Sequence, residues 1–336
     1  MSHIAKPVVT ITGISGFLGS RICFEFLKTG QYTMRGTVRN KNNEAKIAPL
    51  RKAYGPLFDQ IELVEADLLD SDSVHRAVAG STYVVHTASP VNFTPKDPDD
   101  VLKPAIEGTH AVMKACTAHS VKRVVVTSGI VSVNKMDPID KPDYMTGYYD
   151  ETCWSNPNRP EGLKVYYKSK YMAEKLAWDY VKDLPEHKKL ELVTVIPTLI
   201  FGPSLLPGGF TSGQFMAGYF NPKRSFVPPG FIDMVDVRDV AKIHLEAIKR
   251  PDAAYNRFLA HSERAYHLDI ATALAEEFGP KGFTICTKPA KGNPELDAIV
   301  SNRKAREFFD MDFISAKNAS IALAQSFIDL GVLKPN

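Results

Sequence analysis

The residues with the clearest capacity for chemistry are a tyrosine and a lysine near the middle of the chain. Tyr166 and Lys170 stand four positions apart in the run YYKSK, so on a helix their side chains share one face. A free phenol has a pKa of about 10, and a neighbouring ammonium group lowers that pKa by stabilising the phenolate. Such a pair can give a proton to a substrate oxygen, as the reduction of a carbonyl requires. Tyr167 is a poorer candidate, because the residue four positions after it is Tyr171.

A glycine-rich segment near the N-terminus indicates a phosphate-binding loop. In TGISGFLG, Gly13, Gly16 and Gly19 follow an expected strand and open an expected helix. The first glycine permits a tight turn, the second lets a pyrophosphate approach the helix N-terminus, and the third permits close helix–strand packing. The spacing is GxxGxxG, and a glycine-rich turn without a ligand is the alternative. The flanking strand and helix favour dinucleotide binding.

The end of the second expected strand indicates which dinucleotide binds. NAD sites carry an acidic residue there for the ribose 2′-hydroxyl, whereas residues 31–43 contain no Asp or Glu. Arg35, Arg39, Lys41 and Lys46 occupy this region instead, and guanidinium groups pair well with phosphate. We therefore expect NADP(H), with a solvated basic loop as the alternative.

These residues need elements that position them, and the chain supplies a suitable pattern. Short runs rich in Val and Ile alternate with helical patterns, and such runs are typical of parallel strands covered on both faces. We expect strands over 8–12, 33–39, 61–66, 83–87, 123–127 and 191–196, and helices over 17–28, 42–54, 71–78, 99–119, 163–184, 236–249, 268–277 and 316–330. Residues 134–162 predict a long loop, and FGPSLLPGGF opens a less regular region that extends to about residue 230.

The predicted fold class is α/β, a Rossmann-type doubly wound parallel sheet with a smaller, mixed α/β C-terminal substrate-binding region. We expect residues 1–203, joined by 231–250, to form the NADP-binding domain. Residues 204–230 and 251–336 are expected to form the substrate-binding region.

Composition and charge argue against several other classes of protein. The chain has 336 residues, 44% of them hydrophobic, and a net charge of +3 that is too small and dispersed to indicate a nucleic-acid partner. Its four cysteines have no metal-type spacing, so we expect no metal. We find no apolar run of about 18 residues and no signal-peptide pattern, so we expect a cytoplasmic protein without a membrane span.

Taken together, the motifs resemble the extended short-chain dehydrogenases/reductases, in particular the branch of dihydroflavonol reductases, cinnamoyl-CoA reductases and yeast-type carbonyl reductases. The likeness covers almost the whole chain and is carried by TGISGFLG, GTVRN, VVHTASPV, KRVVVTSG, YDETCWSNP, YYKSKYMAEKLAW, VIPTLIFGPSLLPG and MVDVRDVAKIHLEAI. The resemblance implies that Tyr166 and Lys170 are catalytic and that residues 204–229 shape the substrate pocket. It implies an NADP(H) site lined by Gly13, Ser15, Gly16, Phe17, Leu18, Gly19, Arg39, Lys46, Asp67, Leu68, Thr87, Ala88, Ser89, Thr127, Tyr166, Lys170, Pro197, Thr198 and Leu199. From the residues alone, Asp67 could accept a hydrogen bond from the adenine amino group or cap a helix.

One departure from the family pattern bears on catalysis. The family usually carries a hydroxyl residue as the second member of a Ser-Ser or Ser-Thr pair after the central strand, and here the pair reads Ser128-Gly129. Ser128, Ser132 or a water molecule could supply the hydroxyl, and a strand-end hydroxyl bonded to the backbone is the alternative for Ser128. Loss of a comparable oxyanion donor costs about 10²–10³ in rate.

Two further positions bear on substrate choice. The run typical of cinnamoyl-CoA reductases around the tyrosine is absent, since the chain reads GLKVYY there, and this argues against an acyl-CoA substrate. Asn134 stands where flavonoid reductases tend to carry a polar substrate contact, although such an asparagine is also a common turn residue.

The expected activity is the NADPH-dependent reduction of a small-molecule aldehyde or ketone to an alcohol, by a monomer or homodimer. One alternative is an epimerase or dehydratase of nucleotide sugars, which the basic second strand disfavours. Another is a non-catalytic NADP(H) sensor. Gly129 is the best support for the sensor, and the pair Tyr166 and Lys170 argues against it.

Overall fold

A sheet of seven parallel strands forms the centre of the computed structural model, which describes residues 5–90, 92, 94–136, 139–143, 145–158, 163–208, 210–292 and 297–335. The strand order is β10-β7-β5-β4-β1-β2-β3. The bounds are β1 (Val8–Thr12), β2 (Thr33–Val38), β3 (Ile61–Glu65), β4 (Tyr83–His86), β5 (Arg123–Thr127), β7 (Glu191–Pro197) and β10 (Asn256–Ala260). The order reverses between β1 and β4, which is where doubly wound sheets bind ligands. The predicted Rossmann-type fold is therefore confirmed.

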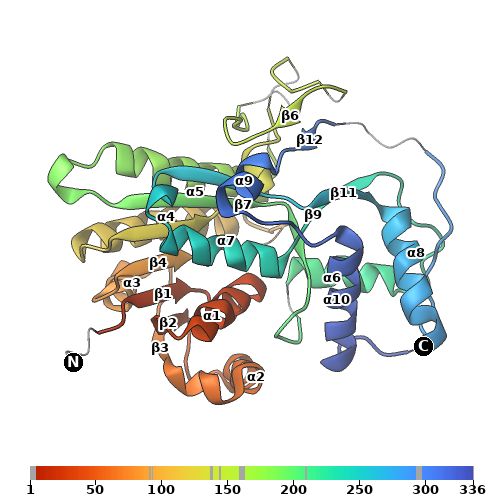
Figure 1. Cartoon of the computed structure of the whole chain (residues 1–336), viewed down its shortest axis with the longest axis horizontal. Helices are drawn as coiled ribbons and strands as arrows, with labels where there is room; N and C mark the ends of the chain where they lie inside the picture. The colour runs from red at the N-terminus through yellow and green to blue at the C-terminus, as the bar shows by residue number, and fades with distance from the viewer. Residues whose placement is uncertain are drawn as a thin grey trace.

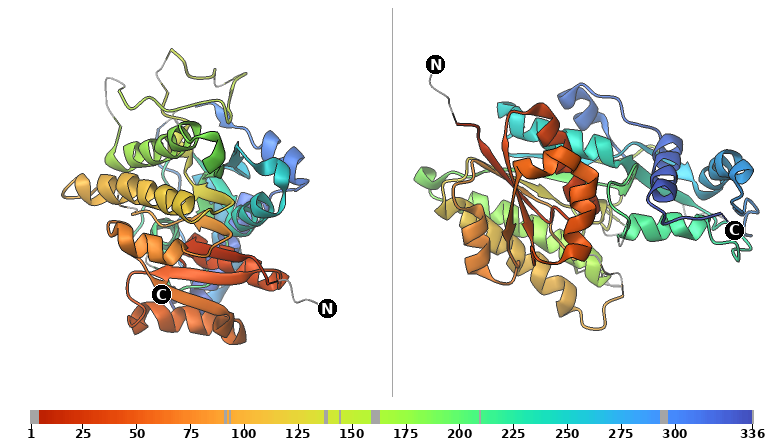
Figure 2. Two further views of the ribbon diagram at one scale, coloured as in Figure 1. Left: turned by 90° about the vertical axis from the view of Figure 1, so that its left-hand side faces the viewer. Right: turned by 90° about the horizontal axis from the view of Figure 1, so that it is seen from below.

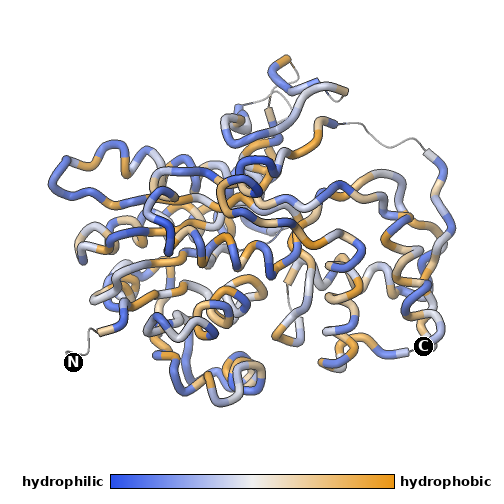
Figure 3. The backbone as a smooth tube through the Cα atoms, viewed as in Figure 1, coloured by the Kyte–Doolittle hydropathy of each residue, from blue (hydrophilic) through white to orange (hydrophobic). Residues whose placement is uncertain are grey.

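Helices cover both faces of this sheet (Figure 2). They are α1 (Phe17–Thr29), α2 (Glu44–Tyr54), α3 (Ser71–Val78), α4 (Asp99–Ala118), α5 (Val165–Lys182) and α7 (Val237–Lys249). Helices α3, α4 and α5 pack side by side, and α1 packs against α7. Ile11, Val84, Val125 and Val193, one from each of four central strands, are fully buried between the helix layers. The strands are apolar because helices cover both faces of the sheet. The outermost loops, by contrast, carry mostly hydrophilic residues (Figure 3).

A second, smaller region lies beside the central sheet, on the right in Figure 1. Its three-stranded mixed sheet has the order β11-β9-β8. The elements there are β8 (Leu199–Phe201), β9 (Phe231–Asp236), β11 (Glu263–Tyr266), α6 (Thr211–Tyr219), α8 (His267–Phe278) and α10 (Ala316–Asp329). The predicted mixed α/β character of this region is confirmed.

The remaining elements are short. Strand β6 (Tyr148–Tyr149) pairs with β12 (Ile299–Val300), and the pair protrudes at the top of Figure 1. Helix α9 (Arg303–Phe309) and the 3₁₀ helices η1 (Gly55–Gln60), η2 (Ile130–Ser132), η3 (Glu186–Lys188), η4 (Pro251–Ala253) and η5 (Gly279–Lys281) complete the description. Within the described ranges, no helix combines the length and apolar character needed to cross a membrane.

Several elements differ from those predicted from the sequence. Strand β10 pairs with β7 in the central sheet, although we expected residues 251–336 to form the substrate-binding region. Helix α6 lies in the stretch predicted to be irregular, where Gly213 and Gly218 weaken the helical signal. Strand β8 was not predicted either, and it ends at Phe201, where that stretch begins. The predicted loop 134–162 includes β6, while its residues 137, 138, 144 and 159–162 lie outside the described ranges. The overall division into two domains stays a prediction.

Candidate active site

The glycine-rich loop between β1 and α1 has the geometry expected of a phosphate cradle. Gly13 has a φ of +74°, which favours glycine, and a Cβ added at Gly19 would lie 2.4 Å from the Gly13 carbonyl oxygen. Gly16 precedes α1, whose first turn contains no acidic residue and receives no side-chain cap. The first backbone N–H groups of a helix lack intrahelical partners, so this N-terminus can receive an anionic group.

Thr12 forms hydrogen bonds to Thr87 and Ala88, which directly follow β4. The Thr12 hydroxyl oxygen accepts hydrogen bonds from the backbone N–H groups of Thr87 (3.2 Å) and Ala88 (3.1 Å). The Thr87 hydroxyl in turn donates to the Thr12 carbonyl (2.6 Å). The structure thus brings Thr87 and Ala88 against the loop, with Ser89 next in the chain.

A buried histidine, which the sequence did not single out, holds Thr12 in place. Because the Thr12 oxygen accepts two bonds, its single proton is left for Nδ1 of His86, 2.8 Å away. The opposite ring nitrogen, Nε2, then donates to Thr109, whose own hydroxyl donates to the Ala105 carbonyl. Burial, with Lys170 as the second cause, lowers the pKa of His86 to about 3, so the ring is neutral.

The basic residues in and after β2 differ in their contacts. Arg39 and Lys46 are exposed, and within the described chain neither forms a salt bridge. Arg35 is different: it forms an ion pair with Glu62 on β3 (2.8 Å) and donates to the carbonyls of Ala77 and Ala79. Including Arg35 among the groups for a phosphate was therefore wrong, because the strand register places it opposite a carboxylate.

An acidic residue does approach the end of β2, and it comes from the neighbouring strand. The Glu65 carboxylate at the end of β3 accepts the backbone N–H of Lys41 (3.0 Å). The sequence argument considered only residues 31–43 and missed it. Glu65 is itself exposed, as are the side chains of Arg39, Lys41 and Lys46, so the end of β2 is flanked by one carboxylate as well as by these basic residues.

Asp67 and Leu68 follow β3. Asp67 accepts the N–H of Leu69 (2.9 Å), while the N-cap of α3 is Asp70, which accepts from Asp72 and Ser73. The helix-capping role considered for Asp67 was therefore wrong. Asp67 is exposed, and Leu68 packs against α4, where a Cβ on Gly108 would lie 2.8 Å from the Leu68 side chain.

Tyr166 and Lys170 lie on α5, as predicted, but their acidities differ from the expectation. Burial, followed by Tyr167, raises the pKa of Tyr166 to about 12. Burial lowers the pKa of Lys170 to about 8, and Glu174 opposes that change. Lys170 is 7% exposed, and its Nζ lies 3.4 Å from the Thr127 carbonyl oxygen. The expected lowering of the tyrosine pKa was therefore wrong for the protein alone, and near neutral pH Tyr166 holds the proton that it could donate.

The two serines proposed to assist the tyrosine are engaged elsewhere. Ser128 and Ser132 each donate to the same carboxylate oxygen of Glu174, at 2.6 Å. A serine hydroxyl has one proton, so neither serine has a proton left for a substrate. The catalytic role expected for Ser128 or Ser132 stays a prediction. The backbone-bonded alternative for Ser128 was wrong, because its partner is a side chain.

The strand ends beside Lys170 are held by backbone and side-chain bonds. His244 donates from Nδ1 to the Val240 carbonyl, so its Nε2 accepts the Thr127 hydroxyl (2.8 Å). The Thr198 N–H donates to the Ala260 carbonyl (3.0 Å), which joins the ends of β7 and β10. The predicted segment of Pro197, Thr198 and Leu199 therefore lies where the chain passes from β7 to β8.

Phe210 and Asn134, from later segments of the chain, have contacts or buried atoms that bear on the site. Phe210, at the start of α6, stacks on Phe17 with ring centroids 4.4 Å apart and planes 7° apart. No local sequence pattern predicts this contact, because it joins distant segments. The Oδ1 atom of Asn134 is buried and, within the described residues, accepts no hydrogen bond. Its role as a substrate contact stays a prediction.

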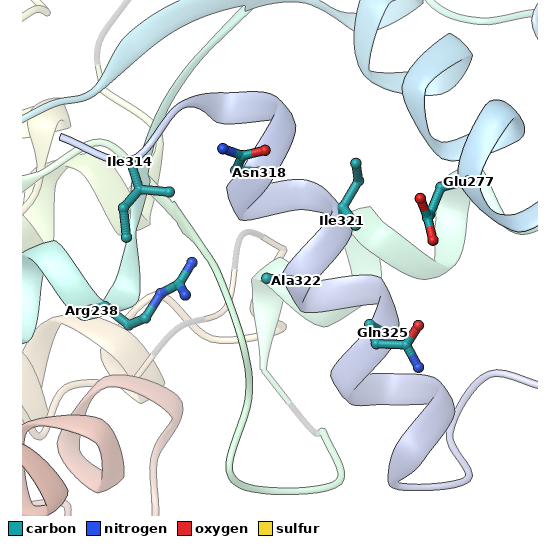
Figure 4. A pocket seen from close by; sticks show the side chains of 7 residues that line it. All are labelled: Arg238, Glu277, Ile314, Asn318, Ile321, Ala322 and Gln325. Carbon is teal, nitrogen blue, oxygen red and sulfur yellow. The ribbon is translucent and has the colours of Figure 1, made fainter.

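A groove of about 590 Å³ on another part of the molecule is shown in Figure 4. It is lined by Arg238, Glu277, Ile314, Asn318, Ile321, Ala322 and Gln325, chiefly from α10 and its neighbours. Its lining includes no predicted site residue, so we separate it from the candidate active site.

Comparison with known proteins agrees with the fold. Residues 9–259 match the NAD dependent epimerase/dehydratase family. The chain is 35% identical to cinnamoyl-CoA reductase 1 of Petunia hybrida over 279 residues, 83% of this chain and 79% of the relative. It is 33% identical to dihydroflavonol 4-reductase of Zea mays over 283 residues, 81% of this chain and 75% of the relative. The solved structure of yeast methylglyoxal/isovaleraldehyde reductase Gre2 complexed with NADPH superposes with a TM-score of 0.81 at 26% identity, covering 97% of this chain and 100% of that one.

Proposed function

The chain belongs to the NAD dependent epimerase/dehydratase family, and on that premise we propose that it is an NADPH-dependent reductase that converts an aldehyde or ketone into an alcohol. The observation that carries the proposal is the pair Tyr166 and Lys170 on one face of α5. The tyrosine keeps its proton near neutral pH, and the lysine beside it is buried. A protonated phenol next to a buried ammonium group suits the transfer of a proton to a carbonyl oxygen.

The residues present fit NADP(H). The uncapped N-terminus of α1 suits the pyrophosphate, and Arg39 and Lys46 suit a 2′-phosphate. Thr87, Ala88 and the β7–β8 junction lie at the carboxyl ends of strands, where such cofactors bind. When bound, NADPH supplies the hydride. The relatives named reductases and the NADPH in the Gre2 structure support this choice.

In the proposed reaction the protein orients the carbonyl and supplies its proton. Tyr166 donates from its hydroxyl to the carbonyl oxygen as that oxygen gains negative charge. The Lys170 ammonium favours the resulting phenolate electrostatically. Gly129 contributes no hydroxyl and Ser128 and Ser132 are bonded to Glu174, so Tyr166 is the proposed proton source.

The proposal is tested by mixing the purified protein with NADPH or NADH and a panel of aliphatic aldehydes, diketones, aryl ketones and dihydroflavonols. We expect consumption of NADPH with at least one carbonyl, and a clear preference over NADH. Tight NADPH binding without consumption across the panel would favour the sensor. Conversion of a nucleotide sugar with tightly retained NAD would favour the epimerase.

A further inference from the structure

A buried carboxylate lies one helical turn beyond the proposed catalytic lysine. Glu174 is 1% exposed, and Tyr166, Lys170 and Glu174 follow one another at intervals of four on α5. The spacing places all three on one side of the helix. An ionised side chain so deeply buried is unusual unless it is paired, so its partners indicate what it does.

The Glu174 carboxylate joins four separate parts of the fold. One oxygen accepts from Thr194 on β7 (3.0 Å) and Arg257 on β10 (2.9 Å). The other accepts from Ser128 and Ser132, on the loop after β5 (2.6 Å each). Four donors satisfy the four lone-pair sites of a carboxylate.

We propose that Glu174 is a positioning residue of the reductase: it holds the 128–132 loop on α5 and places a negative charge one turn from Lys170, on the side of the helix that carries the proton donor Tyr166. This inference rests on the proposed function and extends it to a residue that does not touch the reacting atoms. It also accounts for both serines: they fix the loop to α5 through Glu174.

The other charged and titratable groups around Lys170 do not replace Glu174. His86 on β4 is neutral, because burial lowers its pKa to about 3. His244 on α7, which contacts Thr127, is neutral because burial lowers its pKa to about 4. Arg257 on β10 is a second buried cation. Within the described chain, Glu174 is therefore the negative charge that acts on the lysine.

Arg257, which is bonded to Glu174, has further partners of its own. Its Nη1 donates to the carbonyls of Glu151 (2.6 Å) and Cys153 (2.9 Å), and its guanidinium lies 3.6 Å from the centre of the Trp154 ring. If Glu174 lost its charge, Lys170 and Arg257 would remain as two buried cations without a nearby anion. Lys170 would then give up its proton at a lower pH.

The test compares Glu174→Gln and Glu174→Asp with the wild-type protein. Glu151→Gln is the matched control, because the Glu151 carboxylate is also largely buried but bonds the backbone of Leu259. Two readouts are taken on each protein. One is the pH dependence of kcat/KM for carbonyl reduction. The other is the NMR titration of ¹³C-labelled lysine side chains, in which the Lys170 signal is assigned by its loss in Lys170→Arg.

In Glu174→Gln, we expect both the Lys170 titration and the falling alkaline limb of activity to move to lower pH by about 1 to 3 pH units. Glu174→Asp keeps the charge and should retain the wild-type profile, even if kcat falls. Glu151→Gln should leave both profiles in place. A folded Glu174→Gln protein in which Lys170 titrates as in the wild type would overturn the proposal.

A second variant keeps the test decisive if Glu174→Gln does not fold. Arg257→Gln removes the competing buried cation, so the Lys170 titration should move to higher pH, and the absence of such a movement would overturn the proposal. The NMR titration needs no substrate. A wild-type protein that reduces no carbonyl would contradict the proposed function, and this result would be distinct from a failure of the charge coupling between Glu174 and Lys170.

Discussion

Gly129 offers a direct way to ask what the missing hydroxyl costs the proposed reaction. Its backbone is extended, with φ of −171° and ψ of 155°, which any residue adopts. A Cβ added there would lie 4.0 Å from Lys170 Cγ and 4.0 Å from Val131 Cγ2, which is ordinary van der Waals contact. Gly129→Ser should therefore fold without strain and place a hydroxyl beside the catalytic pair.

The size of the effect follows from the chemistry of the added donor. Established oxyanion donors contribute about 10²–10³ in kcat. A newly introduced hydroxyl is not held by supporting bonds, so we expect a smaller gain in kcat, of about tenfold, which corresponds to about 1.4 kcal/mol in activation free energy.

The assay measures NADPH consumption by the wild type, Gly129→Ser and Gly129→Ala. The alanine variant has the same Cβ and no hydroxyl, so the difference between the two variants isolates the oxygen atom. If both variants fold and bind NADPH while Gly129→Ser is no faster than Gly129→Ala, the reasoning about the missing hydroxyl is refuted.

Three further predictions follow from the geometry. Arg39→Gln should weaken NADPH binding by about tenfold to a hundredfold and leave NADH binding unchanged, because a hydrogen bond to a charged group contributes about 1.5–3 kcal/mol. Titration of both coenzymes checks this, with exposed Arg51→Gln as the control. Equal effects on the binding of both coenzymes would refute it. Phe210→Ala removes the ring that stacks on Phe17, so it should lower Tm and weaken NADPH binding severalfold, since an aromatic pair contributes about 0.5–1.5 kcal/mol beyond area burial. Thermal unfolding and coenzyme titration check this, with Phe215→Ala on the exposed side of α6 as the control. An equal effect of Phe215→Ala would count against the prediction. The reduction rate should stay constant below about pH 8 and fall above it, because Lys170 loses its proton at a pKa of about 8 while the pKa of the Tyr166 phenol is about 12. A rate that stays constant well above pH 8 would contradict this prediction.

The fold was largely predictable because its signals are local. The parallel strands are apolar on both faces, and each run of Val and Ile stands between helical patterns. The glycine cradle was equally visible, because the φ of Gly13 and the close contact at Gly19 need no distant partner. Strand β10 escaped prediction because its sequence, NRFLA, contains no Val or Ile and begins with two polar residues.

The errors at the site share one physical cause, which is partners distant in sequence. Glu174 is 46 positions from Ser128, and no local pattern indicates that its carboxylate accepts the hydrogen bonds of the serine hydroxyls. Arg35 was misassigned because Glu62, on the adjacent strand, pairs with it. The raised pKa of Tyr166 likewise comes from burial that only the assembled fold creates.

We propose that the Tyr166 hydroxyl supplies the proton in an NADPH-dependent reduction. It is tested most directly by single-turnover NADPH consumption in Tyr166→Phe and Tyr167→Phe, with NADPH binding measured for both. Each variant removes one hydroxyl from the same turn of α5. We predict that Tyr166→Phe loses about 10²–10⁴ in rate while it still binds NADPH, and that Tyr167→Phe stays within a few-fold of the wild type. A Tyr166→Phe protein that consumes NADPH at the wild-type rate would contradict the claim.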